Sequence, residues 1–386
     1  MHVPLPAALE QRRRRHVVFV INDFLVGGAQ RQLTRQLSLY DQSAFTFSVV
    51  TLFDFPCRPT LYERIPAAVA VHRLAFKRAF DVQGLWSFFR LMRTIHPDLV
   101  VSSLFLANTI CRAFQPFFRY RTIAREHNTY IDKPRWAVWV DRILARVSRK
   151  IVAVSCSVAE FTSRQERLPL DAFTVIPNGI DLEEIEAAVT RFGPTAKQDV
   201  CRHLGIPPQA KIVLSVGRLT AQKNQDALLR AFAQFSAKHT EYVLCLLGGG
   251  GLMGRLQALV HELSLDRRVF LLGSVRDVER FYLASDFFVS TSMIEGLSNA
   301  QLEALAYGLP IVVTRTGGAK ELLREGKNGF AIDGFTSADI LVGMERLIAA
   351  GPLDSMRREA RATAKRLDIR KTVAAYERLF HDCLRA

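Results

Sequence analysis

The amino-acid sequence predicts an α/β protein with two doubly wound, Rossmann-like domains. Short apolar runs rich in β-branched residues alternate with helical patterns along the whole chain, which is typical of parallel sheets covered by helices. This alternation starts again in the second half, and 386 residues are too many for one ordinary hydrophobic core. We therefore expect the carboxyl ends of both sets of strands to face one interdomain cleft, where such sheets bind their ligands.

Several apolar runs in each half are expected to form strands. In the first half they lie at about 17–21, 46–52, 69–73, 98–102, 121–125, 150–154 and 173–176, and in the second half at about 211–216, 242–247, 268–272, 286–291 and 310–314. Turn-forming residues in Ile176-Pro-Asn-Gly-Ile-Asp181 and Gly205-Ile-Pro-Pro208 surround the change of domain, which we place near 185–205. The predicted parts are an N-terminal domain over 1–190, a C-terminal domain over 191–370 and an amphipathic closing helix over 371–386.

The composition describes a globular protein with a strong basic excess. Hydrophobic residues make up 49% and charged residues 23% of the chain, which argues against an intrinsically disordered protein, and the formal net charge is +15. Such an excess favours anionic partners, namely nucleotide phosphates, acidic lipid headgroups or nucleic acid. No run reaches the roughly 18 to 20 apolar residues that a membrane-spanning helix needs, so we expect any membrane contact to be peripheral.

The start of the chain and its cysteines favour a cytoplasmic protein. The segment Arg12-Arg-Arg-Arg-His-Val-Val-Phe-Val-Ile21 has too short an apolar run for a signal peptide, and we expect it to be the first buried strand behind a basic tail. The six cysteines show no Cys-x-x-Cys spacing. They are expected to be reduced and buried, neither paired in disulfides nor bound to metal.

Two cations follow the strand expected at 211–216. Arg218 and Lys223 bracket a short loop before a helix expected over 226–236. At the carboxyl end of a parallel strand, such a pair can neutralise a diphosphate and stabilise a departing nucleotide. Taken alone, they could equally be two solvated surface cations in a chain with 52 lysines and arginines.

Glu295 and Glu303 frame a passage from a strand to a helix. A buried strand is expected before Glu295, and Gly308 marks the point where the following helix should stop. We expect Glu295 to lie in the loop and Glu303 about two turns into the helix.

The start of this helix, at Leu297, Ser298 and Asn299, offers unpaired backbone N–H groups to an anion. Ser298 and Asn299 could also serve as a plain N-cap, and both roles can coexist. A phosphate held there would have a carboxylate on each side, each able to bind sugar hydroxyls. The sequence therefore predicts a nucleotide-sugar site, with Glu295 at the transferred sugar and Glu303 at the ribose.

The pattern of a glutamate, seven residues and a second glutamate on a strand, loop and helix resembles the retaining glycosyltransferases of family 4, which have the GT-B fold. Further motifs match in the expected order, and the resemblance covers nearly the whole chain. They are Leu25-Val-Gly-Gly-Ala-Gln-Arg31, Val175-Ile-Pro-Asn-Gly-Ile-Asp181, Ser215-Val-Gly-Arg-Leu-Thr-Ala-Gln-Lys-Asn224 and Thr316-Gly-Gly-Ala-Lys-Glu-Leu322.

The resemblance implies roles for residues of the N-terminal domain. Gly28 would let the backbone approach the donor phosphates, although Gly27 and Gly28 could also form an ordinary tight turn. His127 would lie beside the transferred sugar and bind a hydroxyl or balance developing positive charge, although a lone histidine is often structural. Glu126 is an alternative polar contact.

The chain lacks an Asp-x-Asp motif and histidine pairs with zinc-type spacing. We therefore expect metal-independent transfer without a cofactor, in which the helix N-terminus and the two cations replace a divalent ion. Only one carboxylate is expected at the sugar, which disfavours a covalent double displacement. Retention by front-face attack is the hypothesis that the resemblance implies. Ser298-Asn299 also resembles the subset that uses UDP-linked N-acetylated hexoses.

Aromatic and basic residues interleave in three segments of the N-terminal domain, where the resemblance places the acceptor. These segments are Phe76-Lys-Arg-Ala-Phe80, 85–93 and 135–150. Such interleaving is typical of helices at a membrane interface, and for 85–93 a core-facing helix explains it at least as well. A lipid-linked acceptor at the cytoplasmic face of an anionic membrane would fit.

The leading prediction is a retaining enzyme that moves a hexose or N-acetylhexosamine from a nucleotide-diphosphate sugar, UDP-linked, to a glycan or lipid-linked acceptor in polysaccharide or glycolipid biosynthesis. A nucleotide-sugar epimerase of the same fold is one alternative. The other is a non-catalytic basic protein that binds a membrane or nucleic acid. No RNA- or DNA-binding motif supports nucleic acid as a partner.

Overall fold

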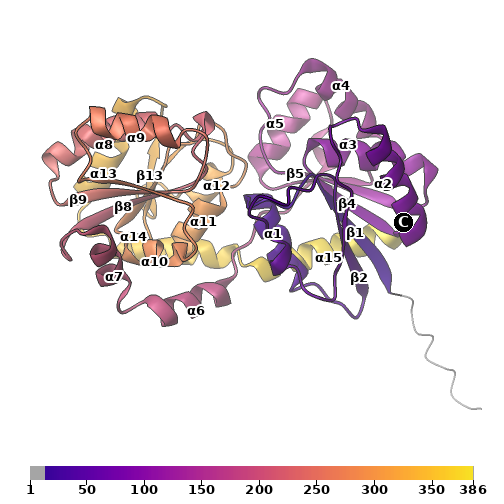
Figure 1. The fold of residues 1–386 in the computed structure, drawn as a ribbon, viewed down its shortest axis with the longest axis horizontal. Helices are drawn as coiled ribbons and strands as arrows, with labels where there is room; N and C mark the ends of the chain where they lie inside the picture. The colour runs from indigo at the N-terminus through magenta and orange to yellow at the C-terminus, as the bar shows by residue number, and fades with distance from the viewer. Residues whose placement is uncertain (1–13, 386) are drawn as a thin grey trace, which may run out of the picture. The chain divides into compact units, whose positions relative to one another are not determined.

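The computed structural model describes residues 14–385, which form two parallel β-sheets with helices on their faces (Figure 1). The first sheet has seven strands in the order β3-β2-β1-β4-β5-β6-β7, and the second has six in the order β10-β9-β8-β11-β12-β13. This arrangement confirms the predicted α/β class with two Rossmann-like halves. Arg12 and Arg13 of the expected basic tail lie outside the described residues.

The strands and helices alternate along the chain. The strands are β1 (Arg15–Ile21), β2 (Phe45–Thr51), β3 (Ala70–Arg73), β4 (Leu99–Ser103), β5 (Arg121–Glu126), β6 (Lys150–Ala153), β7 (Phe173–Val175), β8 (Lys211–Val216), β9 (Tyr242–Leu247), β10 (Val269–Gly273), β11 (Phe287–Ser290), β12 (Ile311–Thr314) and β13 (Gly329–Ile332). The helices are α1 (Gly28–Leu37), α2 (Val82–Ile95), α3 (Phe105–Phe114), α4 (Arg135–Leu144), α5 (Cys156–Glu166), α6 (Leu182–Phe192), α7 (Ala196–Leu204), α8 (Gln225–Lys238), α9 (Met253–Glu262), α10 (Val278–Ala284), α11 (Asn299–Ala306), α12 (Ala319–Leu322), α13 (Ser337–Ala349), α14 (Asp354–Arg366) and α15 (Ile369–Arg385).

The expected strands are confirmed with small shifts at their ends, and one strand was missed. β13 is Gly-Phe-Ala-Ile and pairs in parallel with β12, with Ile311 opposite Gly329. Four residues that begin with glycine and contain one β-branched side chain carry little strand signal. The pairing at the edge of the sheet, rather than local preference, makes this segment a strand.

Contacts between Cα atoms divide the chain into two compact units. Of the described residues, the first unit contains those up to Arg125, Ile143–Ile151 and those from Tyr376 onwards. The second unit contains Glu126–Arg142 and Val152–Ala375.

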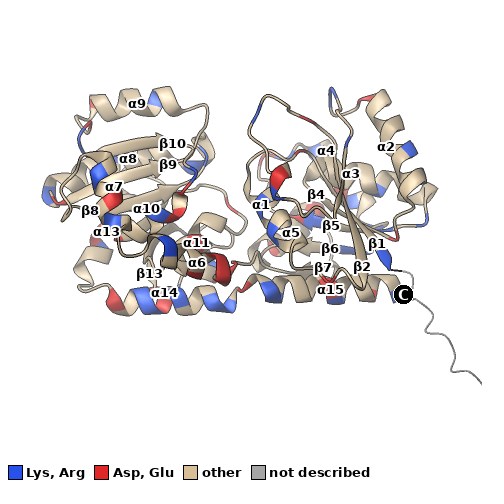
Figure 2. Ribbon diagram, turned by 60° about the horizontal axis from the view of Figure 1, so that its bottom comes forward, with Lys and Arg blue, Asp and Glu red and all other residues tan. Residues whose placement is uncertain are grey.

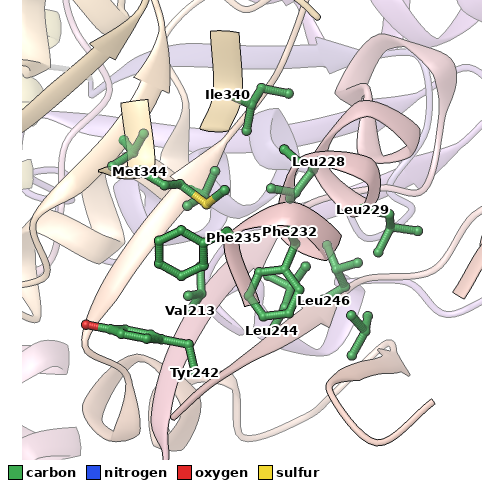
Figure 3. Packing of buried hydrophobic residues seen from close by; sticks show 14 of the residues in the cluster. Val213, Leu228, Leu229, Phe232, Phe235, Tyr242, Leu244, Leu246, Ile340 and Met344 are labelled. Carbon is green, nitrogen blue, oxygen red and sulfur yellow. The ribbon is translucent and has the colours of Figure 1, made fainter. Parts of the chain in front are cut away.

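The core of the second unit forms between its sheet and α8. Leu228, Phe232 and Phe235 recur at helical spacing along α8 and are fully buried. They pack in one cluster with strand residues such as Val213 and Leu244 (Figure 3). Each large apolar side chain buried in this way contributes about 1.5–3 kcal/mol, so the strands that carry the site at their carboxyl ends are firmly supported.

The C-terminal helix packs on the first unit through aromatic side chains. The ring of Phe380 lies 5.6 Å from that of Tyr40 and 5.7 Å from that of Phe45, and the Arg125 guanidinium lies 4.8 Å from the ring centre of Tyr376. The predicted closing helix is therefore confirmed as an element.

Figure 2 shows basic and acidic residues interleaved along α14 and α15, as expected for solvated helix faces.

The six cysteines are free thiols, as expected. Four of them are buried, but Cys57 and Cys156 are exposed, so the prediction that all are buried was wrong. Cys156 is the first residue of α5, where it is exposed to solvent. Within residues 14–385, no helix has both the length and the apolar character needed to cross a membrane.

Candidate functional site

The two glutamates lie where a strand passes into a helix, as predicted. β11 ends at Ser290, Glu295 lies in the following loop, and α11 runs from Asn299 to Ala306 before Gly308, whose φ is +81°. Glu303 is the fifth residue of α11, just over one turn into the helix rather than two. The helix begins later than expected because Ser298 still has extended backbone angles.

Lys223 and Glu295 form an ion pair, although they are 72 positions apart in the sequence. Their side chains are only 18% and 17% exposed. Lys223 ends a short 3-10 turn after β8, at the carboxyl edge of the sheet. The structure thus joins two residues that the sequence assigned to different parts of a donor molecule.

Three hydrogen bonds hold the backbone on each side of this ion pair. The Gln222 amide donates to the Ile294 carbonyl at 2.7 Å, and the Met293 N–H donates to the Gln222 carbonyl at 2.8 Å. The Thr291 hydroxyl donates to the Lys223 carbonyl at 2.8 Å. The Lys223 turn and the Glu295 loop therefore position each other before any ligand binds.

Arg218 is exposed at the carboxyl end of β8, while its backbone is fixed. The Gln225 amide donates to the Arg218 carbonyl at 2.9 Å, and the neighbouring Leu219 N–H donates to the Gly249 carbonyl at 2.9 Å. An exposed guanidinium on a fixed backbone is suited to an anion that arrives from solvent.

The glycine run at 248–251, which the sequence predicts to be a flexible structural turn rather than a catalytic loop, follows β9. Gly248 has a φ of +133°, and a Cβ there would collide with the Gly217 carbonyl oxygen. The run therefore packs directly against the backbone that carries Arg218. Consecutive glycines directly after a strand were the available signal for such a close backbone approach.

The Thr316-Gly317-Gly318 motif supports the Glu295 loop from the other side. Gly317 has a φ of +47°, and a Cβ there would collide with the Glu295 carbonyl oxygen. The Gly318 N–H donates to the Gly296 carbonyl. Any larger residue at Gly317 would displace the loop that presents Glu295.

His127 follows β5 and is half-buried, and its backbone lies against the Glu295 loop. A Cβ added at Gly296 would collide with the His127 carbonyl oxygen. Two segments almost 170 positions apart are therefore in close backbone contact, as expected if His127 and Glu295 serve one site. Glu126, the alternative polar contact, is buried with 6% exposure.

Asn178 holds the start of α11, a role that the sequence analysis missed. Its Nδ2 donates to the Leu297 carbonyl at 3.2 Å and to the Asn299 Oδ1 at 3.1 Å. Its position inside the motif at 175–181 was the available signal.

Ser298 occupies the N-cap position, but its side chain makes no capping hydrogen bond. The alternative of a plain serine cap is therefore wrong, and Ser298 leaves the first N–H groups of α11 uncapped by its hydroxyl.

Glu303 is buried, with 7% exposure, and its carboxylate accepts a hydrogen bond from the Tyr282 hydroxyl at 3.2 Å. Tyr282 belongs to α10 and stacks on Tyr307 at 5.2 Å. Burial raises the pKa of nearby Glu279, and the charges of Glu184 and Glu303 add to this rise. Glu303 thus has a fixed side chain among other acidic side chains. Such a carboxylate can accept hydrogen bonds from hydroxyls but would repel phosphates.

Gly28 and Glu321 belong to two further motifs, at 25–31 and 316–322. Gly28 begins α1 in the first unit, after an extended Gly27. Glu321 accepts a hydrogen bond from the Ser157 N–H at the start of α5, at 3.3 Å. Burial raises the pKa of Glu321, against the lowering effect of the Ser157 and Cys156 backbone N–H groups.

No group of three or more metal-ligating side chains occurs in the part of the chain that the structure describes.

Most of the described chain matches two families of glycosyltransferases. Residues 26–184 match the family Glycosyltransferase Family 4, and residues 197–366 match the family Glycosyl transferases group 1. The structure of Anabaena HepE in complex with UDP superposes with a TM-score of 0.81 at 19% identity, and covers 95% of this chain and 100% of that chain. At this identity, the likeness shows the GT-B fold.

Two relatives of named activity match about half of the chain. One is the N-acetylgalactosamine-N,N'-diacetylbacillosaminyl-diphospho-undecaprenol 4-alpha-N-acetylgalactosaminyltransferase of Campylobacter jejuni, 31% identical over 50% of this chain and 49% of that protein. The other is the UDP-Gal:alpha-D-GlcNAc-diphosphoundecaprenol alpha-1,3-galactosyltransferase of Escherichia coli, 29% identical over 50% of each chain. The matched region thus spans about half the length of these relatives.

Proposed function

We propose that the protein, which matches Glycosyltransferase Family 4 over residues 26–184 and Glycosyl transferases group 1 over residues 197–366, transfers a hexose or N-acetylhexosamine with retention of configuration. The donor would be a UDP-linked sugar and the acceptor a glycan or a lipid-linked molecule. The ion pair of Lys223 with Glu295, in the loop that leads into α11, carries the proposal. It places a cation, a carboxylate and backbone N–H donors together, which are the groups that a sugar diphosphate requires.

The phosphates would bind to Arg218, to Lys223 and to the backbone around Leu297, Ser298 and Asn299. An ammonium group has three N–H donors, so Lys223 can keep its bond to Glu295 while it donates to a phosphate oxygen. As the bond to the sugar breaks, negative charge grows on the departing diphosphate, and these donors stabilise it.

The sugar and the ribose would bind to the acidic side chains. Glu295 would accept hydrogen bonds from hydroxyls of the transferred sugar, with His127 beside it, and Glu303 would bind the ribose. Gly28 would contribute its backbone N–H to the donor phosphates. Glu295 is assigned to the sugar because it pairs with Lys223, which would bind the adjacent phosphate. Glu303 is assigned to the ribose because its carboxylate is buried apart from this ion pair.

The names of the relatives support the substrate classes. The Escherichia coli relative is named for a UDP-linked sugar, and both relatives are named for acceptors linked to undecaprenol through a diphosphate. We propose a lipid-linked acceptor and a peripheral position at the inner face of the membrane. On α4, Trp136 and Trp139 are 55% and 64% exposed beside basic residues, which supports contact with an anionic surface.

The donor site can be tested by thermal shift with UDP-, GDP- and ADP-linked sugars. We expect UDP-sugars to stabilise the protein most, by about 2.7 kcal/mol at a concentration of 100 times Kd. Glu303→Gln should weaken donor binding about tenfold or more, because a hydrogen bond to a charged group is worth about 1.5–3 kcal/mol. Tyr282→Phe is the matched control, since it removes the hydroxyl that donates to Glu303 but keeps the carboxylate.

The proposal fails if no nucleotide-sugar stabilises the protein. It must be revised if Tyr282→Phe weakens binding as much as Glu303→Gln does. UDP released without an added acceptor, together with an epimerised sugar, would favour the epimerase instead.

Transfer should not depend on a divalent ion, because protein cations and helix N–H groups are proposed to carry the phosphate charge. We expect activity in an excess of EDTA to stay within about twofold of the untreated rate. Complete loss that Mg²⁺ or Mn²⁺ restores would contradict the metal-free mechanism.

A further inference from the structure

A cavity of about 650 Å³ lies in the first unit, at the amino ends of its central strands. Arg15 begins β1, Asp98 precedes β4 and Arg121 begins β5, and all three line this cavity. Its size falls in the range of ligand-binding pockets. We call it the amino-edge cavity.

The amino-edge cavity is separate from the glycine loop that is proposed to approach the donor phosphates. β1 has seven residues, each rising about 3.3 Å, so its two ends are about 20 Å apart. Gly27 and Gly28 follow its carboxyl end, whereas Arg15 stands at the amino end. A ligand in the cavity would therefore lie at the opposite end of β1 from this loop.

The charges around the cavity favour an anion. Four arginines line it, and Asp98 is the one carboxylate among the described residues that do so. Asp98 is already occupied, since it pairs with Arg15 at 3.0 Å and accepts the His16 N–H at 2.8 Å. Arg93 and Arg119 are exposed and have no ion pair within residues 14–385. Two unpaired guanidinium groups at one cavity are suited to a phosphate.

The remaining wall is aromatic and continues to the surface. Phe89 and Phe118 line the cavity with their ring centres 5.1 Å apart, and Trp86 stacks on Phe89 at 5.6 Å. Trp86 is 60% exposed, and Phe117, another lining residue, is 71% exposed. An exposed aromatic surface of this kind marks an interaction site, and tryptophan beside arginine is typical of a membrane interface.

We propose that the amino-edge cavity binds the phosphate headgroup of an anionic phospholipid, with Trp86 and Phe117 inserted into the membrane interface. A concave site with arginines on one wall and aromatic rings on the other matches an amphiphile with a phosphate next to apolar chains. A compact cavity fits a headgroup better than an extended nucleic-acid strand, which needs a long groove. The inference does not depend on the transfer chemistry or on α4.

The test is sedimentation of the full chain with vesicles of phosphatidylglycerol and phosphatidylcholine. We expect the wild type to bind the phosphatidylglycerol-containing vesicles, and Arg93→Ala with Arg119→Ala to bind at least tenfold more weakly. The matched control is Arg267→Ala with Arg358→Ala, which removes two exposed arginines of the second unit that also have no ion pair among the described residues. This control should change binding less than twofold.

A second pair of variants tests the aromatic wall. Trp86→Ser with Phe117→Ser should reduce the binding that persists at 0.5 M salt, where electrostatic attraction is screened. Both pairs alter exposed side chains, so thermal unfolding should be unchanged and should confirm the fold.

Several outcomes would overturn the proposal. Equal losses in the cavity and control variants would show only general attraction to net charge. Protection by inorganic phosphate without any vesicle binding would indicate a small-anion site, and tighter binding to single-stranded RNA would indicate a nucleic-acid site. None of these measurements uses a nucleotide-sugar, so their failure is distinguishable from failure of the proposed transfer.

Discussion

Lys223→Ala should lower kcat for sugar transfer by about two to three orders of magnitude, the cost of removing one group that stabilises developing charge. Lys223 is the ion-pair partner of Glu295, and both side chains are more than four-fifths buried. Its loss removes a phosphate donor and also leaves Glu295 without its counter-ion. We expect an additional loss of about 1.5–3 kcal/mol in the free energy of unfolding, as for a hydrogen bond to a charged group.

The matched control is Lys211→Ala. Lys211 lies at the opposite end of β8 and pairs with Glu241, and these side chains are 48% and 45% exposed. Activity of this variant should stay within about twofold of the wild type, because exposed pairs contribute little. Steady-state kinetics with a UDP-sugar donor would separate the two variants. Near-normal turnover of Lys223→Ala would refute its phosphate role.

Lys133→Met should cost about 3–5 kcal/mol of unfolding free energy, the cost of breaking a buried ion pair. Lys133 pairs with Asp141 on α4 and with Glu166 on α5, the latter at 2.6 Å, and the three side chains are 6%, 2% and 3% exposed. Burial alone would lower the pKa of Lys133, but the charges of Asp141, Glu126 and Glu166 raise it above its usual value. Methionine would leave two buried carboxylates without a cation.

Urea unfolding would measure this loss against Arg164→Met. Arg164 pairs with Glu160 on α5 at 3.2 Å, with side chains 79% and 52% exposed, so its loss should cost less than about 1 kcal/mol. Adding Asp141→Asn and Glu166→Gln to Lys133→Met should restore much of the stability, because the uncompensated charges disappear. Equal effects of Lys133→Met and Arg164→Met would contradict the role of a buried cation.

The buried lysine also affects the candidate site. Lys133 ends the loop that begins at His127, and the Gln165 amide fixes the same loop by donating to the Tyr130 carbonyl at 2.8 Å. Loosening this loop should displace the His127 backbone from Gly296. We therefore expect Lys133→Met to lose activity even at temperatures where it remains folded.

Most of the fold was predictable because its signals are local. Parallel strands buried on both faces appear as short β-branched runs, and turns mark their ends, so neighbouring residues reveal each element. β13 was missed because its strand pairing, not its own residues, determines it. The boundary near 185–205 and the parts 1–190, 191–370 and 371–386 remain predictions.

The candidate site was predictable in its members but not in its contacts. Glu295 in a loop and Arg218 and Lys223 after a strand follow from the order of elements along the chain. The roles of Asn178 and of the glycines at 248 and 317 were not visible, because they depend on which backbones approach each other. The alternative in which the Ser298 side chain caps α11 is wrong for the same reason, since Asn178 rather than Ser298 holds the start of this helix.

The sequence by itself determined the α/β class, the alternation of strands and helices, and the placement of acidic and basic side chains at strand ends. Only the tertiary structure decided that Lys223 meets Glu295, that Asn178 meets Asn299 and that four arginines surround one cavity. Secondary structure follows from residues a few positions apart. The contact of Lys223 with Glu295 joins residues 72 positions apart, and that of Asn178 with Asn299 joins residues 121 positions apart. Such contacts depend on the register and packing of whole strands.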